Sequence, residues 1–264
     1  MDRSVFYDAL GQPHAPAPDA RIVSLVPSIT ELLCDLGLAE RLVGRTGFCI
    51  HPRDTVRAIP KVGGTKDVNV DRLRALAPTH VVVNIDENEK PTVDRIAAFV
   101  PHVIVTHPLG PEDNLALVRL LGGVFGADAA AAAWCGDFAA TLAALRAQTG
   151  RTPPQRVLYC IWQDPWMTVS RDTYIAAMLA EIGWTVPDLG PDRYPRFDWN
   201  DTLVRGIDQV LLSTEPYRFT EAHADALERQ IGKPVQLVDG EMMSWYGSRA
   251  LGGLRYLDRL RQGI

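Results

Sequence analysis

The chain has 264 residues, of which 47% are hydrophobic and 22% charged, and its formal net charge is −5. This composition is typical of ordinary globular domains and excludes disordered tails and disulfide-stapled miniproteins. At about 100 to 200 residues per domain, the length suits two modest domains or one large one. The mild acidity, with no block of basic residues, gives no footprint for nucleic acid, so we expect a small molecule or a protein as partner.

The N-terminal sequence and the cysteines bear on location. Asp2, Asp8 and Asp19 interrupt the first twenty residues, which lack the basic start and apolar core of an export signal. We therefore expect the chain as written to stay in the cytoplasm, and to be periplasmic if a leader was trimmed from it. The four cysteines show no CxxC spacing, so we expect reduced thiols in buried or half-buried positions.

Short segments rich in Val and Ile alternate with stretches of helical period, which indicates strand–helix units and a mostly parallel sheet covered by helices. Glycines at helix ends and prolines at helix starts support the assignments. The first half of the chain predicts a strand at 22–26, a helix at 29–36 ended by Gly37, a helix at 70–76, a strand at 80–84, a helix opened by Pro91 and a strand at 103–105.

Residues 111–150 show no strand pattern. They predict a helix at 115–125 and an Ala-rich, proline-free helix at 127–148 that would span about 33 Å, which suits a rod between two domains. The strand–helix pattern restarts after residue 154. It predicts a strand at 156–161, a helix at 174–182 ended by Gly183, a strand at 210–212, a helix at 221–230, a strand at 235–238 and a final helix at 251–260.

The predicted fold class is therefore α/β, with two Rossmann-like lobes that have parallel-type sheets and are joined by one long backbone helix. We expect residues 1–111 to form the N-terminal lobe with its arm. Residues 112–150 would form a helical connector that includes the long helix, and residues 151–264 the C-terminal lobe.

Motifs of known chemistry are absent from the sequence. It has no glycine-rich phosphate loop, no nucleophile elbow and no zinc-ligand spacing, so we expect no catalytic residues, no metal site and no cofactor. Cys49 and His51 flank Ile50, and since a nucleophile needs its base within hydrogen-bond reach, we expect this pair to pack in a loop or to contact a ligand rather than to catalyse. The acidic loop at 86–89 follows a predicted strand end. Its carboxylates either contact a ligand or cation, or only precede a helix whose N-terminal dipole favours negative charge.

The strongest signal is aromatic. Loops at the carboxyl ends of strands face the ligand crevice of open α/β sheets, and rigid rings there suit a large planar or cyclic ligand. The alternative for each ring is a place in the core. The aromatic residues in loop segments of the second half are Trp162, Trp166, Tyr194, Trp199, Trp245 and Tyr246.

Several segments carry a family resemblance. They are RIVSLVPSITELL at 21–33, VGGT at 62–65 before NVDR at 69–72, and APTHVVV at 77–83, with looser matches at 238–241 and 248–249. The chain resembles the helical-backbone (class III) substrate-binding proteins of ABC importers, most closely the cobalamin-binding members. The resemblance implies two lobes with a cleft between them, and binding without catalysis by a monomer that meets importer membrane subunits.

The resemblance also implies a ligand and its contacts. The ligand would be a corrinoid or another tetrapyrrole-type metal chelate. Phe48 stands where the family has Tyr, and Thr65 stands where cobalamin-binding members have an aromatic residue. The predicted ligand-binding residues are Phe48, Thr65, Glu87, Trp162, Trp166, Tyr194, Trp245 and Tyr246.

Two acidic residues match docking positions of the family. Asp71 and Asp201 stand where importer-binding members usually present Glu to arginines of the membrane subunits. The alternative is that each only stabilises a helix N-terminus. An enzyme or carrier in the cytoplasm on the same scaffold, using Glu87, Cys49 or Asp239 on a haem, siderophore or other metal chelate, also remains open.

Overall fold

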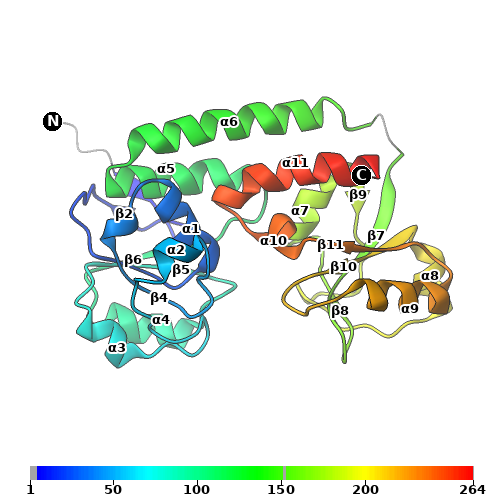
Figure 1. Cartoon of the computed structure of the whole chain (residues 1–264), viewed down its shortest axis with the longest axis horizontal. Coiled ribbons are helices and arrows are strands. Elements are labelled where there is room, and N and C mark those ends of the chain that lie inside the picture. The colour runs from blue at the N-terminus through cyan, green and yellow to red at the C-terminus, as the bar shows by residue number, and fades with distance from the viewer. Residues whose placement is uncertain (1–4, 151–152, 264) are drawn as a thin grey trace. The chain divides into compact units, whose positions relative to one another are not determined.

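The computed structural model describes residues 5–150 and 153–263, and the chain divides into two units, each with its own parallel sheet. Unit 1 comprises the described residues of Met1–Pro108 together with Glu112–Phe138 and Tyr246–Ser248. Unit 2 comprises Leu109–Pro111, the described residues of Ala139–Trp245 and those of Arg249–Ile264. Figure 1 labels most elements of both units.

The segment predicted as a connector, 112–150, is shared between the two units, and the predicted domain boundaries stay a prediction. Helix α5 (Asp113–Phe125) belongs to unit 1, because its apolar face, including Leu121 and Phe125, is buried there. Helix α6 (Asp128–Arg146) is one continuous helix, and it passes from unit 1 to unit 2 after Phe138.

Unit 1 is built on four parallel strands in the order β4-β3-β5-β6. Because the strands are parallel, their carboxyl ends lie at one edge of the sheet, where ligands bind in open α/β folds. Besides α5, the elements of unit 1 are β1 (Phe6–Tyr7), β2 (Pro13–His14), β3 (Ile22–Ser24), α1 (Pro27–Asp35), the 3-10 helix η1 (Ala39–Arg41), β4 (Leu42–Arg45), α2 (Arg53–Val56), α3 (Val70–Ala75), β5 (His80–Asn84), α4 (Lys90–Ala97) and β6 (His102–Thr106).

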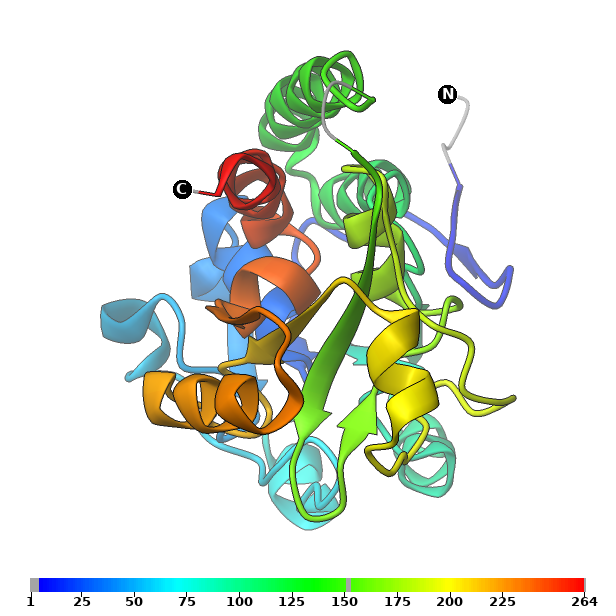
Figure 2. The same cartoon turned by 90° about the vertical axis from the view of Figure 1, so that its right-hand side faces the viewer.

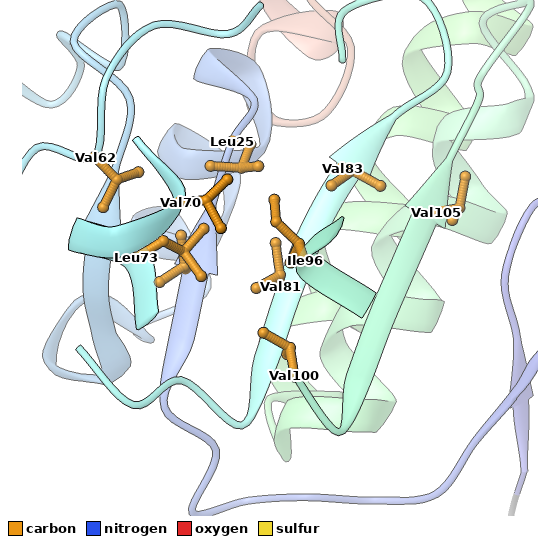
Figure 3. Close-up of a cluster of buried hydrophobic side chains, with 10 residues drawn as sticks. Leu25, Val62, Val70, Leu73, Val81, Val83, Ile96, Val100 and Val105 are labelled. Carbon is orange, nitrogen blue, oxygen red and sulfur yellow. The ribbon is translucent and has the colours of Figure 1, made fainter. Parts of the chain in front are cut away.

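The core of unit 1 lies on the face of the sheet that α3 and α4 cover (Figure 3). Alternate strand residues point into it, as the pleat requires. Val81 and Val83 enter this cluster, whereas Val82 between them is buried on the opposite face, behind which α5 lies in Figure 3. Both faces of the sheet are therefore covered, and only its ends remain for function.

Strand β4 was not predicted, because its sequence Leu-Val-Gly-Arg is short and contains a glycine, which strands disfavour. Packing explains Gly44: a Cβ there would lie 2.6 Å from Leu76 Cδ1 and 3.1 Å from Val23 Cγ2. The close approach of neighbouring side chains thus overrides the local propensity.

Unit 2 has the strand order β11-β10-β7-β8, with β7, β10 and β11 parallel and β8 antiparallel to β7. Figure 2 shows β7 and β8 side by side, joined by a short loop. Helices α8 and α9 bury their apolar residues against this sheet. The elements are β7 (Gln155–Trp162), β8 (Met167–Thr168), α7 (Tyr174–Ala180), β9 (Trp184–Thr185), α8 (Asp201–Gly206), β10 (Gln209–Ser213), α9 (Glu221–Ile231), β11 (Val235–Val238), α10 (Gly240–Ser244) and α11 (Ser248–Gln262).

The predicted strands and helices are all present, with ends shifted by a few residues. The predicted glycine ends are confirmed, since Gly37 and Gly183 both have positive φ, at 79° and 77°. The four cysteines are unpaired; Cys34 is half-buried and the other three are buried. In the described part of the chain, no helix has the length and apolar character needed to cross a membrane.

Candidate ligand-binding site

The loops at the carboxyl edge of the unit 1 sheet are joined by Asn88. Its Nδ2 donates to the backbone oxygens of Leu25 after β3 (3.3 Å) and of Thr65 (2.9 Å), and its Oδ1 accepts from the backbone N–H of Asn84 at the end of β5 (2.9 Å). The side chain is buried, so these hydrogen bonds are shielded from water. One amide therefore fixes the two loops that carry the predicted residues Thr65 and Glu87.

Phe48 presents its ring to solvent from the loop after β4, with 62% of the residue exposed. The backbone beneath it is held by a hydrogen bond from Gly47 N–H to Gly63 O (2.7 Å). Gly64 lies against the ring, because a Cβ at Gly64 would be 3.3 Å from Phe48 Cε2. The ring is thus fixed on one side and open on the other, as a stacking contact requires.

Glu87 and Asp86 follow β5, and both carboxylates have partners inside unit 1. Tyr246 donates its hydroxyl proton to Glu87 Oε1 (2.5 Å), and His107 Nε2 lies 3.5 Å from Asp86 Oδ2. Tyr246 is only 7% exposed, and burial together with the Glu87 charge raises the pKa of its hydroxyl. Tyr246 is thus a buried anchor for Glu87, and its contact with a ligand stays a prediction.

Cys49 has no catalytic setting. The residue is fully buried, and its Sγ lies within hydrogen-bond distance of Thr30 Oγ1 (3.1 Å) and Thr46 Oγ1 (3.2 Å). Burial raises the pKa of the thiol, so it stays protonated, whereas a nucleophilic cysteine needs a thiolate. The structure gives Cys49 a packing role beneath the Phe48 loop.

In unit 2, Trp162 ends β7 and is exposed over 39% of its surface. Its ring meets Tyr217 edge to face, with 5.5 Å between the ring centroids. Tyr217 follows the neighbouring strand β10, and its N–H donates to Ile161 O (3.3 Å). An aromatic pair from two strands thus stands at the carboxyl edge of this sheet.

Trp166 does not share this position, and its role as a ligand contact stays a prediction. It is half-buried and packs against the sheet-and-helix core of unit 2. Its neighbours are rings rather than solvent, because the short β7–β8 loop turns it back onto the sheet. The rings around it are Phe197, Trp199 and Phe219, with centroids at 6.2, 5.5 and 5.8 Å.

Tyr194 and Trp245 complete the predicted set. Tyr194 is exposed, and the Arg193 guanidinium lies 5.9 Å from its ring centroid. Trp245 is half-buried at the end of α10, where its Nε1 donates to Glu215 Oε1 (2.8 Å) and the Arg249 guanidinium lies 4.7 Å from its ring centroid. It follows that the Trp245 indole and the Glu215 carboxylate lie together just past the carboxyl end of β10.

The two predicted docking residues have the same local setting. Asp71 in α3 and Asp201 in α8 are exposed, each in the first turn of a helix. In both helices an Asn at the N-cap accepts from a backbone N–H: Asn69 from Arg72 (2.9 Å) and Asn200 from Leu203 (3.0 Å). Since the Asn side chains already perform the capping, neither Asp carboxylate is needed for it, and neither has an ion-pair partner in the described chain.

Sequence reasoning missed several residues at these edges. Ile50 and Ile85, after β4 and β5, are exposed apolar side chains. The position of Ile85 just past the predicted strand at 80–84 was a usable signal, whereas Ile50 follows a strand that was not predicted. Tyr217 and Glu215 follow β10, and only the three-dimensional pairing with Trp162 and Trp245 identifies them. The described residues hold no group of three or more His, Cys, Asp or Glu side chains placed to bind a metal ion.

Comparison with known proteins gives a family match and several relatives. Residues 22–187 match the model of a family described as periplasmic binding protein. The vitamin B12-binding protein of Vibrio vulnificus (strain CMCP6) is 22% identical over 209 residues, which cover 79% of this chain and 73% of that protein. The vitamin B12-binding protein of Photorhabdus laumondii is 22% identical over 198 residues, covering 75% and 72%.

Solved structures share the fold. The periplasmic vitamin B12-binding protein of Vibrio cholerae superposes with a TM-score of 0.79 at 18% identity, covering 94% of this chain and all of that one. The periplasmic haem-binding protein RhuT of Roseiflexus sp. RS-1 gives a TM-score of 0.75 at 22% identity, covering 92% and 97%. At these identities the structures confirm the predicted α/β architecture.

Proposed function

Because the chain belongs to the periplasmic binding protein family, we propose that it captures a tetrapyrrole-type metal chelate, a corrinoid in the first place, and presents it to an ABC importer. The family match confirms the predicted class, which is a substrate-binding protein and not an enzyme. The relatives named above support the choice of chelate, since their names give vitamin B12 or haem as the ligand. They also support the periplasmic alternative for the location.

The observation that carries this proposal is the exposure of aromatic rings at strand carboxyl ends in both units. Phe48 in unit 1 and Trp162 in unit 2 are large rings open to solvent, although exposed rings of this size are costly in water. Each is held by its neighbours, Gly64 and Tyr217, so little conformational entropy is lost when a flat ligand stacks on it.

A corrinoid fits better than a haem because of what the exposed rings offer. Phe48 and Trp162 carry no metal-ligating atom, and a cobalamin brings its own axial ligands to its metal, so shape and stacking suffice. Haem iron takes an axial ligand from the protein, such as His or Tyr. Haem is the second candidate, favoured by the partly exposed His107 and Tyr217 at the two sheet edges.

The experiment is purification without added ligand, followed by absorption spectroscopy and mass spectrometry of whatever is bound, and then a fluorescence titration. Cyanocobalamin, dicyanocobinamide and haemin are each added while tryptophan emission is followed. We expect quenching by the corrinoids with a Kd of about 1 μM or tighter, roughly −8 kcal/mol. Quenching by haemin alone moves the assignment to haem, and no response to any of the three removes tetrapyrroles.

A further inference from the structure

Glu215 packs closely against Gly240, where a larger residue would clash with it. It follows β10, and Gly240 at the start of α10 lies against it: a Cβ on Gly240 would be 2.6 Å from Glu215 Cγ and 2.9 Å from its backbone nitrogen. In this position Glu215 Oε1 accepts two hydrogen bonds, from Trp245 Nε1 (2.8 Å) and Ser244 Oγ (3.0 Å). The carboxylate thus ties the residues at the end of α10 to the end of β10.

The charge of Glu215 is unfavourable where it stands. Burial, and then the nearby carboxylates of Glu241 and Asp239, raise its pKa. Arg249 from α11 pairs with Glu241 instead, and no cation pairs with Glu215 among the residues that the structure describes. A carboxylate kept in such a place points to a functional requirement, because local conflicts of this kind concentrate at functional sites.

Trp245 is fixed by groups at its edge and its face. Glu215 receives its Nε1–H, and the Arg249 guanidinium lies 4.7 Å from the ring centroid. A hydrogen bond to an ionised acceptor is short and strong, so the charged form of Glu215 holds the indole best. An aromatic ring held in one orientation before the ligand arrives contributes more to affinity than a mobile one.

We infer that Glu215 is a positioning residue of the ligand site, which sets the orientation of the Trp245 indole that the ligand meets. This inference rests on the proposed function, since it takes Trp245 as a ligand contact. It adds that ligand affinity depends on the charge of a group that does not touch the ligand.

The test compares Glu215→Gln, Glu215→Ala and Trp245→Phe, with Glu221→Gln as a control that removes an exposed carboxylate from α9. The readouts are near-ultraviolet circular dichroism of the unliganded protein and the Kd for cyanocobalamin, measured from acid to neutral pH. Glu215→Gln keeps an oxygen that accepts the indole proton, so it remains informative if Glu215→Ala fails to fold.

The expected results follow from the hydrogen bond. Glu215→Ala and Trp245→Phe should each lose near-ultraviolet tryptophan ellipticity. Each should bind cyanocobalamin about tenfold more weakly, which corresponds to a loss of about 1.4 kcal/mol in binding free energy. Wild-type affinity should fall at acid pH as Glu215 is protonated. Glu215→Gln should bind within about threefold of wild type at neutral pH, since a neutral hydrogen bond is worth about half of a charged one, and its affinity should not follow pH.

Two results would overturn the inference. One is unchanged ellipticity and affinity in Glu215→Ala. The other is equal loss of affinity in Glu215→Gln and Glu215→Ala with unchanged ellipticity, which would make Glu215 a direct ligand contact. If the wild type binds no probe, the proposed function fails, and the ellipticity of the variants still decides whether Glu215 orients Trp245.

Discussion

Phe48 is the residue whose exposure most needs an explanation. Its ring is held by the backbone of the 61–69 segment and shows its free face to solvent. A phenyl ring in such a place adds surface that water disfavours unless a ligand covers it.

We expect Phe48→Ala to weaken corrinoid binding by about tenfold, because the loss of a stacked ring contact costs about 1 to 2 kcal/mol. Isothermal titration calorimetry measures the change. Tyr7→Ala is the control, since it removes an exposed ring from β1, a strand that is not part of the four-stranded sheet. Equal affinities in Phe48→Ala and wild type would remove Phe48 from the site.

His80 makes unit 1 sensitive to acid. It is buried at the start of β5, and its ring stacks on His102 with 4.6 Å between the centroids. Burial, and then the charges of His102 and His14, lower the pKa of His80 from 6.5 to about 4. The folded state therefore holds His80 neutral at pH values where the unfolded chain already binds a proton.

We expect this group's share of stability to be complete above pH 6.5 and to be lost as the pH falls toward 4. The loss is about 3 kcal/mol at most, since one pKa unit corresponds to about 1.4 kcal/mol. Urea unfolding across this range measures it. His80→Gln should flatten the dependence, and His102→Gln should reduce it. A wild-type dependence retained in His80→Gln would contradict the assignment.

The predicted site residues divide according to what a sequence can show. Trp162 ends β7, whose Val and Ile pattern was clear, so its place at the edge followed from the strand end. Phe48 follows the unpredicted strand β4, and only the family resemblance pointed to it. Trp166 and Tyr246 have the same local pattern, but packing buries one of them partly and the other almost fully. Glu215 carries no local signal, because its partner Trp245 is distant in the sequence.

At the scale of elements, the loops at the unit 1 edge depend on one buried amide. The Asn88 side chain hydrogen-bonds three backbone groups from different segments. They are Leu25 O after β3, the Asn84 N–H at the end of β5, and Thr65 O in the loop before α3. Without this side chain, three backbone groups would lose their partner, and the hydrogen bond that ties Thr65 to the segment after β5 would be lost.

We expect Asn88→Ala to lower the free energy of unfolding by about 2 to 4 kcal/mol, since each of the three lost hydrogen bonds is worth about 1 kcal/mol. Asn200→Ala, which removes one N-cap hydrogen bond in α8, should cost only about 1 kcal/mol. Chemical denaturation of both variants gives the comparison. A cost for Asn88→Ala no larger than that of the cap variant would show that Asn88 does not organise the edge.

The parallel strands were predictable because strands buried on both faces read as continuous Val and Ile runs. Strand β4 was missed since Gly44 serves a packing contact with Leu76, which no local pattern reveals. The two-residue strands β1, β2, β8 and β9 are too short to show any period. Periodicity thus recovers the buried sheet, and tertiary contacts decide its edges.

At the scale of the whole molecule, the long helix was predictable and the division of the chain was not. A proline-free Ala-rich stretch predicts a helix, and α6 is that helix. However, the short segment Tyr246–Ser248 returns to unit 1, where Gly247 N–H donates to the buried Asn114 Oδ1 (2.7 Å). Such a return depends on contacts across more than a hundred residues of sequence.

Docking to an importer is the whole-molecule prediction. We expect Asp71→Lys combined with Asp201→Lys to leave the Kd for the ligand unchanged and to abolish uptake, because both carboxylates are exposed and the Asn caps remain. The helix-dipole cost is about 0.3 to 1 kcal/mol per site, which a melting curve monitors. Asp225→Lys in α9 is the control. Normal uptake by the double variant would rule out docking at these residues.

The most direct measurement is calorimetric titration of cyanocobalamin into the wild-type protein and into a variant that carries both Phe48→Ala and Trp162→Ala. We expect a Kd of about 1 μM or tighter for the wild type and at least about tenfold weaker binding by the variant, the effect of removing one ring contact of about 1.4 kcal/mol. Binding of equal strength by both proteins, or no heat from a folded wild type, would contradict this expectation.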